Sequence, residues 1–144
     1  IVYLTRYDDY DLSIPNSNNH KRSDLNQRIK LINESDCSLF LSIHLNADIS
    51  ESWYGAQVFY DDVNSENVVL AEYLQKEFSS SLNSRRNIKQ ISNLYLYRKA
   101  LRPGVLVEVG FLSNSNERYL LRQDSYQKKI ADTITTGVIN YLSK

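Results

Sequence analysis

The sequence contains few of the residues that mark several common classes of protein. Cys37 is the only cysteine among 144 residues, so the chain can form no internal disulfide and shows no cysteine-based metal spacing. No apolar run is long enough to cross a bilayer, and none resembles a secretory signal. Basic residues number 17 and acidic residues number 17, so no net charge attracts nucleic acid or an anionic membrane. These absences leave a globular domain with a hydrophobic core of its own.

The start of the chain is also informative. It opens on Ile-Val-Tyr-Leu-Thr, which reads as the inside of a strand, with no initiator methionine and no methionine anywhere after it. We therefore expect the chain to be a piece of a longer protein, with any export signal or membrane anchor upstream of Ile1. A glycine-rich phosphate loop and a nucleophile elbow are both missing, which argues against the nucleotide-binding and serine-hydrolase classes.

Apolar strands that alternate with amphipathic helices predict a single α/β domain over residues 1–144. We expect strands at residues 1–5, 39–45, 56–60, 94–97 and 105–109. We expect helices at residues 23–33, 64–82, 114–121 and 125–142, with Asn64 or Ser65 as the cap of the second. Residues 7–21 are polar and are expected to form a loop. This order favours a layered fold around a largely parallel sheet.

Two of these strands each place one titratable side chain near the C-terminal end. His44 ends the apolar run Leu-Phe-Leu-Ser-Ile-His, and Glu108 lies inside Val-Leu-Val-Glu-Val. A carboxylate is expensive to bury unless something pairs with it or uses it. In open α/β sheets, sites form beyond the carboxyl ends of the strands. His44 and Glu108 are therefore the first candidates for a functional site.

His44 has two interpretations. A single histidine in a strand is often a satisfied core or rim residue. However, Ser42, His44 and Asn46 share one strand face because side chains alternate along a strand. A polar face at a strand end suits a site, and neutral imidazole is a common zinc ligand. The other histidine, His20, lies in a polar stretch and is expected to be a surface residue.

Glu108 also has two interpretations. It could be a buried carboxylate paired with Arg98 or Arg102. It could instead be a general base whose pKa is raised by its apolar neighbours, as the activation of a metal-bound water requires. Trp53 and Tyr54 follow the His44 strand and could line a groove for a sugar or a peptide, although a packing role fits them equally well.

The segments around His44 and Glu108 resemble a known family. Ser-Ile-His-Leu-Asn-Ala at residues 42–47 and Leu-Val-Glu-Val-Gly-Phe-Leu-Ser-Asn at residues 106–114 are similar to the two hallmark segments of the zinc-dependent N-acetylmuramoyl-L-alanine amidases. Further stretches fit in order: Thr5-Arg6 with Asp8, the helix from Asp24 to Asn33, Gly-Ala-Gln-Val at residues 55–58, and Leu94-Tyr95. The resemblance covers essentially the whole chain. It is strongest to the spore-cortex branch, which acts in making muramic-δ-lactam.

The resemblance implies a fold, a reaction and a setting. The fold is a single α/β domain with a mostly parallel sheet of about six strands flanked by helices. The reaction is hydrolysis of the peptidoglycan amide between N-acetylmuramic acid and the L-alanine of the stem peptide. His44 is implied as a zinc ligand, Glu108 as the base that activates the zinc-bound water, and Asn46 and Arg98 as substrate-binding residues.

The expected setting is extracytoplasmic, in the cell wall or the forespore intermembrane space. Peptidoglycan is the expected partner, with an accessory protein as a further one and no nucleic acid. Contact with a membrane is expected only through an upstream anchor.

The sequence departs from the family at its start. The family's first strand carries an Asp-Pro-Gly-His-Gly segment with the first zinc histidine, and a glutamate ligand follows; neither is in this sequence. Catalytic zinc usually takes three protein ligands, so we expect residues 1–144 alone to lack the first strand and helix and to hold zinc weakly. Two other functions stay open. One is an amidase-like domain that binds cell wall or a protein partner without catalysis, and the other is an α/β hydrolytic domain that uses Glu108 without a metal.

Overall fold

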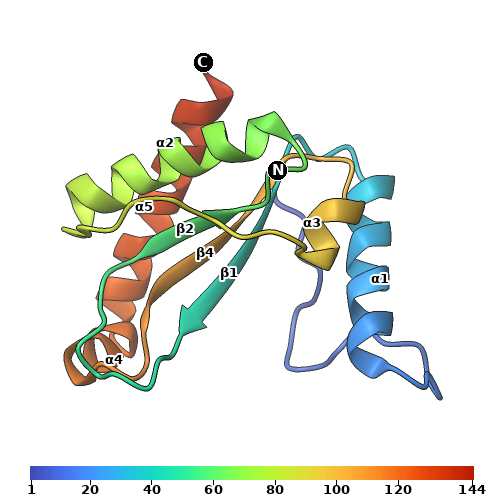
Figure 1. Ribbon diagram of the computed structural model, residues 1–144, viewed down its shortest axis with the longest axis horizontal. Coiled ribbons are helices and arrows are strands. Elements are labelled where there is room, and N and C mark those ends of the chain that lie inside the picture. The colour runs from blue at the N-terminus through green and yellow to red at the C-terminus, as the bar shows by residue number, and fades with distance from the viewer.

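A mixed four-stranded sheet with helices packed around it forms the computed structural model, which describes residues 1–144 (Figure 1). The strands are β1 (Phe40–Asn46), β2 (Gln57–Tyr60), β3 (Lys89–Gln90) and β4 (Gly104–Phe111). The helices are α1 (His20–Glu34), α2 (Ser65–Ser81), α3 (Tyr95–Lys99), α4 (Ser115–Leu121) and α5 (Asp124–Leu142). Most of the expected helices and strands are therefore present.

The strands lie in the order β1-β4-β2-β3. β1 pairs with β4 in parallel, β4 with β2 in antiparallel, and β2 with β3 in parallel. The expected single α/β domain is confirmed, although the sheet has four strands and is smaller than expected. β1 forms one edge of the sheet, and its side chains Ile43 and Leu45 are 58% and 50% exposed.

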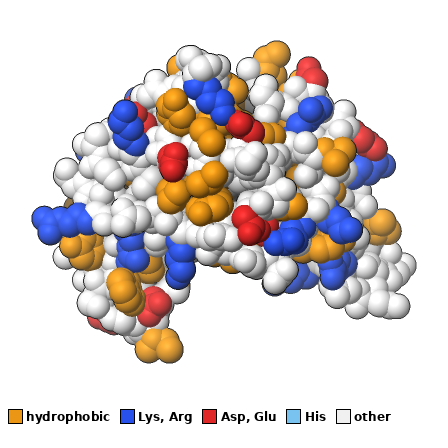
Figure 2. Space-filling view, turned by 45° about the horizontal axis from the view of Figure 1, so that its top comes forward, with side chains coloured by type: hydrophobic (Ala, Val, Ile, Leu, Met, Phe, Trp, Pro, Cys, Tyr) orange, Lys and Arg blue, Asp and Glu red, His pale blue; other side chains and the backbone are white.

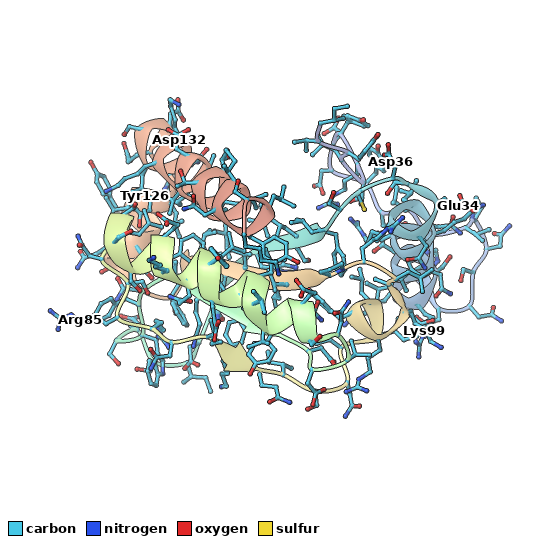
Figure 3. All side chains as sticks on the ribbon, turned by 90° about the horizontal axis from the view of Figure 1, so that it is seen from above. Glu34, Asp36, Arg85, Lys99, Tyr126 and Asp132 are labelled. Carbon is cyan, nitrogen blue, oxygen red and sulfur yellow. The ribbon has the colours of Figure 1, made fainter.

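The hydrophobic core lies between one face of the sheet and the two long helices α2 and α5. The largest fully buried core residues come from β2, β4 and α2: Val58, Val105, Val107, Leu70, Leu74 and Phe78. The two helices approach closely at Gly137 of α5, where an added Cβ would lie 2.8 Å from Leu74 Cδ2. Figure 3 shows α2 and α5 on one side of the molecule and α1 at the opposite end. The core thus occupies one face of the sheet and leaves the other to the candidate site.

Asparagine side chains begin several of the helices. Asn64 caps α2 by accepting from the backbone N–H of Glu66 at 2.9 Å, as one of the two expected caps. Asn114 caps α4 by accepting from the N–H groups of Asn116 and Glu117, each at 3.1 Å. The first N–H groups of a helix have no partner within the helix, so these side chains supply the missing acceptors.

Helix α1 begins at His20, earlier than expected. The side chain of Asn19 accepts from the backbone N–H of Arg22 at 2.9 Å and so supplies the N-cap. His20 is exposed, as expected, but it belongs to the helix, and its Nδ1 lies 2.9 Å from Ser13 Oγ.

The strand expected at residues 1–5 is wrong, because this segment has no regular secondary structure. A strand must pair its N–H and C=O groups with a neighbour, and no strand of the sheet pairs with residues 1–5. Ile1 and Val2 are accordingly exposed. A side-chain contact holds the segment beside α1, where Arg28 donates to the Thr5 hydroxyl at 2.7 Å.

The strand expected at residues 94–97 is also wrong, because α3 forms there instead. The alternation Leu-Tyr-Leu-Tyr suits a strand, but the tertiary contacts favour a helical turn. The backbone N–H of Leu94 donates to the buried carboxylate of Asp61 at 3.1 Å. Tyr97 is buried, with its ring 5.3 Å from that of Phe40 in β1. Contacts between distant segments therefore outweigh the local pattern.

The surface carries charges of both signs. Figure 2 shows Lys, Arg, Asp, Glu and hydrophobic side chains interspersed over one face, in keeping with a formal net charge of zero. None of the helices combines the length and the apolar character that crossing a membrane requires.

Candidate active site

His44 and Glu108 face each other on neighbouring strands. The parallel pairing of β1 with β4 places the Cα of His44 opposite the Cα of Glu108. Residues paired in this way project from the same face of a sheet. Val107 and Val109 of β4 project into the core, so Glu108 and His44 lie on the opposite face. The fold therefore brings together the two residues that the sequence singled out.

Glu108 has an unusual environment for a carboxylate. Its Oε2 atom is buried and has no hydrogen-bond partner. Burial raises the pKa of Glu108, and the neighbouring His44 imidazole acts in the opposite direction. The ion pair considered from sequence is not formed, because Arg98 pairs with two aspartates and Arg102 donates to a backbone carbonyl. No ion pair therefore accounts for the partly buried position of the Glu108 carboxylate.

His44 lies at the exposed end of β1. Its side chain is open to solvent, and its Nε2 atom lies 2.8 Å from the hydroxyl of Ser42 on the same strand face. A hydroxyl can donate to or accept from an imidazole nitrogen, so this contact fits either tautomer of His44. An exposed neutral imidazole can bind a metal or exchange a proton.

Glu117 joins the segment before β2 to the end of β4. Its Oε1 accepts from the backbone N–H of Gly55 at 2.9 Å, and its Oε2 accepts from the N–H of Phe111 at 2.7 Å. Gly110 allows this approach, because an added Cβ there would lie 3.3 Å from Glu117 Oε1. The Glu117 carboxylate thus fixes the start of β2 beside the end of β4.

A groove opens on the β2 side of Glu108. Its volume is about 570 Å³, which lies within the range of about 300–1,000 Å³ that small-ligand sites occupy. We call it the β2 groove, and its lining residues are Ser52, Trp53, Tyr54, Gln57, Arg85, Arg86, Asn87, Ile88 and Lys89. Gln57 pairs in register with Glu108, so the groove begins next to the candidate base.

The β2 groove tests the expectation for Trp53 and Tyr54 and adds two residues to it. Trp53 and Tyr54 do line a groove, as one of their two interpretations had it. Gln57 and Arg86 were missed, because no local pattern links them to the site. Arg86 follows the end of α2 in the sequence, and only the fold brings it to Trp53, with the guanidinium carbon 4.8 Å from the ring centroid.

The two expected substrate-binding residues lie in different surroundings. Asn46 ends β1, where the register with β4 shifts and its Cα partner is Phe111. Its side-chain Oδ1 accepts from the backbone N–H of Ala47 at 2.8 Å. Arg98 lies on α3 and pairs with the buried Asp61 at 3.2 Å. Asn46 is therefore close to the end of the site strands, whereas Arg98 is held by an ion pair.

Tyr97 is a further residue of this region that the sequence did not indicate. Its hydroxyl is buried without a hydrogen-bond partner. Burial raises the pKa of Tyr97, the nearby Ser42 hydroxyl opposes that rise, and the charge of Glu108 adds to it. The sequence predicted a strand here, so it did not predict that Tyr97 is buried. In the structure, Tyr97 is the buried residue of helix α3.

The metal donors in residues 1–144 do not make up a zinc site by themselves. No three His, Cys, Asp or Glu side chains lie close enough together to hold a metal ion. The donors at the site are the His44 imidazole and the Glu108 carboxylate, whereas catalytic zinc usually takes three protein ligands. The site can therefore supply one nitrogen ligand and one base.

Comparison with known proteins gives consistent matches. The sequence profile of the family described as N-acetylmuramoyl-L-alanine amidase matches residues 1–140. The germination-specific N-acetylmuramoyl-L-alanine amidase of Bacillus subtilis (strain 168) is 43% identical over 148 residues, which cover 100% of this chain and 62% of that protein. The amidase LytC of the same organism is 32% identical over 81% of this chain and 24% of its own length. The chain thus spans less than two thirds of these curated relatives.

Solved structures match across the same fold. The structure of the CwlD amidase from Clostridioides difficile in complex with the GerS lipoprotein gives a TM-score of 0.92 at 36% identity, covering 99% of this chain and 76% of that chain. The catalytic domain of CwlV, an N-acetylmuramoyl-L-alanine amidase from Bacillus (Paenibacillus) polymyxa, gives a TM-score of 0.83 at 30% identity, covering 99% and 73%.

Proposed function

Because the chain belongs to the N-acetylmuramoyl-L-alanine amidase family, we propose that the full-length protein hydrolyses the amide between N-acetylmuramic acid and L-alanine in peptidoglycan. The observation that carries this proposal is the register of His44 opposite Glu108, with one oxygen of the Glu108 carboxylate buried and unpaired. The germination-specific relative and the match to CwlD support a role in spore cortex maturation.

Glu108 is the proposed general base. It accepts a proton from the water that attacks the lactyl carbonyl carbon, and it returns the proton to the L-alanine nitrogen as the C–N bond breaks. No donor in the protein engages the buried Oε2, so the carboxylate is not committed to a structural hydrogen bond there. Its raised pKa supports the role, since a base works best when its pKa lies near the working pH.

His44 is the proposed zinc ligand within residues 1–144, and zinc is the proposed cofactor of the full-length protein. When bound, zinc supplies a Lewis acid that polarises a carbonyl and lowers the pKa of a water molecule. Residues 1–144 hold too few donors for the metal, so we propose that a segment outside them supplies the remaining ligands. The greater length of the curated relatives leaves room for such a segment.

Substrate contacts are proposed next to these two residues. Asn46 at the end of β1 lies where the sugar or the peptide would flank the reacting bond. A substrate contact by Arg98 stays a prediction, and its ion pairs with Asp61 and Asp62 would have to open first.

The proposed setting is outside the cytoplasm, in the cell wall or the forespore intermembrane space, where peptidoglycan lies. One solved relative is an amidase in complex with a lipoprotein, and we propose an accessory protein partner for this chain by analogy. Membrane contact is proposed only through an anchor outside residues 1–144.

The competing function is a domain that binds cell wall or a protein partner without catalysis. The observation in its favour is that residues 1–144 bring together only one imidazole and one carboxylate at the site. The two functions differ in whether peptidoglycan is cleaved, so a hydrolysis assay separates them.

The test is Glu108→Gln in the full-length protein, with Glu72→Gln on the exposed side of α2 as the matched control. We expect Glu108→Gln to lower the rate of muropeptide hydrolysis by roughly 10²–10⁴-fold, the usual scale of general base catalysis, with zinc content and unfolding temperature retained. The control should hydrolyse normally. Near-normal hydrolysis by Glu108→Gln would exclude it as the base, and binding without hydrolysis by the unmodified protein would favour the competing function.

A further inference from the structure

The β2 groove contains three cationic residues, Arg85, Arg86 and Lys89, that no acidic residue neutralises. None of them takes part in an ion pair, although Arg28, Arg98 and other basic residues of the chain do. Figure 3 shows Arg85 extending outward beyond the C-terminal end of α2. A groove with several unpaired cations attracts an anionic ligand.

Arg86 is held in a fixed position by uncharged neighbours. Its Nε donates to the Tyr54 carbonyl at 2.8 Å, and its Nη1 donates to Gln57 Oε1 at 3.4 Å. The guanidinium carbon lies 4.8 Å from the ring centroids of both Trp53 and Phe111. Its Nη2 donates no hydrogen bond within the protein. A planar cation that is already ordered and still has free donors suits a carboxylate, which it can bind through two parallel hydrogen bonds.

The groove is close enough to the proposed reacting bond for a few residues of an extended peptide to reach it. Gln57 is the register partner of Glu108 on β2, and Lys89 is the partner of Phe59 on the next strand. Both side chains share the face of Glu108. Neighbouring strands lie about 4.8 Å apart and Lys89 lies two residues further along the sheet, so the groove extends from about 5 to about 12 Å from Glu108. An extended peptide advances about 3.5 Å per residue, so a chain that starts at the reacting bond crosses the groove within roughly three residues.

We propose that the β2 groove binds a free carboxylate of the stem peptide, on one of the residues that follow L-alanine, with Arg86 as the principal contact. Arg85 and Lys89 add attraction from the rim, and Trp53 and Tyr54 border the peptide. This inference rests on the proposed function, because it assigns the peptide side of the amidase substrate to the β2 groove. It makes Arg86 a specificity-determining residue that recognises charge on the peptide.

The test measures binding in the full-length protein carrying Glu108→Gln, so that the ligand is not consumed. The two ligands are muropeptides that differ only in whether the stem-peptide carboxylates are free or amidated, and the method is titration calorimetry at low salt. We expect the free acid to bind about 10-fold more tightly or better, the scale of a hydrogen bond between charged groups. Adding Arg86→Gln should remove this preference, and Lys76→Gln, a neutralised exposed lysine on α2, should retain it.

Arg86 also donates a hydrogen bond to the Tyr54 carbonyl, so Arg86→Gln could weaken binding by disturbing the fold. A second variant controls for this effect. Arg85→Gln with Lys89→Gln changes only exposed side chains and should weaken binding of the acid several-fold while leaving thermal unfolding unchanged. Equal binding of acid and amide by the unaltered groove, or a preference that survives both variants, overturns the inference.

Hydrolysis by the protein with Glu108 intact is measured in parallel. A preference for the acid without hydrolysis counts against the proposed function and supports the groove assignment. Hydrolysis without the preference counts against the groove alone.

Discussion

Replacing Glu117 by glutamine tests how the segment before β2 and the end of β4 are held together beside the site. Each oxygen of the Glu117 carboxylate accepts from one backbone N–H, Gly55 at 2.9 Å and Phe111 at 2.7 Å. In Glu117→Gln, one oxygen remains and the other is replaced by an NH₂ group. One of the two backbone N–H groups therefore loses its acceptor and faces another donor.

The magnitude follows from the burial of these groups. Gly55 and Phe111 are both buried, so water does not readily replace the lost acceptor. A hydrogen bond to a charged group contributes about 1.5–3 kcal/mol, and leaving a buried donor unsatisfied costs about 1–3 kcal/mol. We expect the free energy of unfolding to fall by about 2–3 kcal/mol. In a domain of this size, that corresponds to a decrease of about 4–12 °C in Tm.

The assay is urea and thermal unfolding of the full-length protein, followed by circular dichroism, with Glu72→Gln as the control for an equivalent change on an exposed helix surface. A loss below about 0.5 kcal/mol, the usual range for exposed substitutions, would refute the reasoning. It would mean that the contact between the segment before β2 and the end of β4 does not depend on the Glu117 carboxylate.

Three further predictions concern single side chains. His44→Ala should lower the zinc content of the dialysed full-length protein, because the remaining ligands hold a poorer site; full zinc occupancy would exclude His44 as a ligand. The hydrogen bond from Arg28 holds the pKa of Asp24 below its ordinary value of 3.8, so ionised Asp24 stabilises the fold above that pH and the contribution is lost as the pH falls through the folded pKa. Asp24→Asn should therefore be less stable than the wild type at pH 7 and similar to it at about pH 2, and equal urea midpoints at pH 7 would contradict this. Tyr97→Phe removes a buried hydroxyl that has no partner, so the free energy of unfolding should stay the same or rise by up to about 1 kcal/mol; a clear decrease on urea unfolding would reveal a hydrogen bond to that hydroxyl.

The elements that sequence reasoning predicted well carry their information locally. In α2, Leu70, Leu74 and Phe78 recur at helical spacing, and all three are fully buried. The cap at Asn64 is likewise a property of neighbouring residues. The errors at residues 1–5 and 94–97 concern short segments. In both, the conformation depends on whether a distant segment pairs with the backbone or covers the side chains.

The site shows the same division. His44 and Glu108 could be found from sequence because each is a titratable residue near the end of an apolar strand, which is costly unless the group is used. Gln57 and Arg86 could not be found, because their link to Glu108 runs through strand pairing and loop packing. For Trp53, the sequence could not decide between lining a groove and packing in the fold.

The sequence by itself determined the family, the α/β class and the two chemical groups at the centre of the site. Only the tertiary structure decided that β4 lies between β1 and β2, and so that Glu108 has His44 on one side and Gln57 on the other. The physical reason is that local residue patterns set the conformation of a strand, whereas its neighbours are set by hydrogen bonds and packing between residues far apart in the chain. The β2 groove and its unpaired cations arise entirely from such distant contacts.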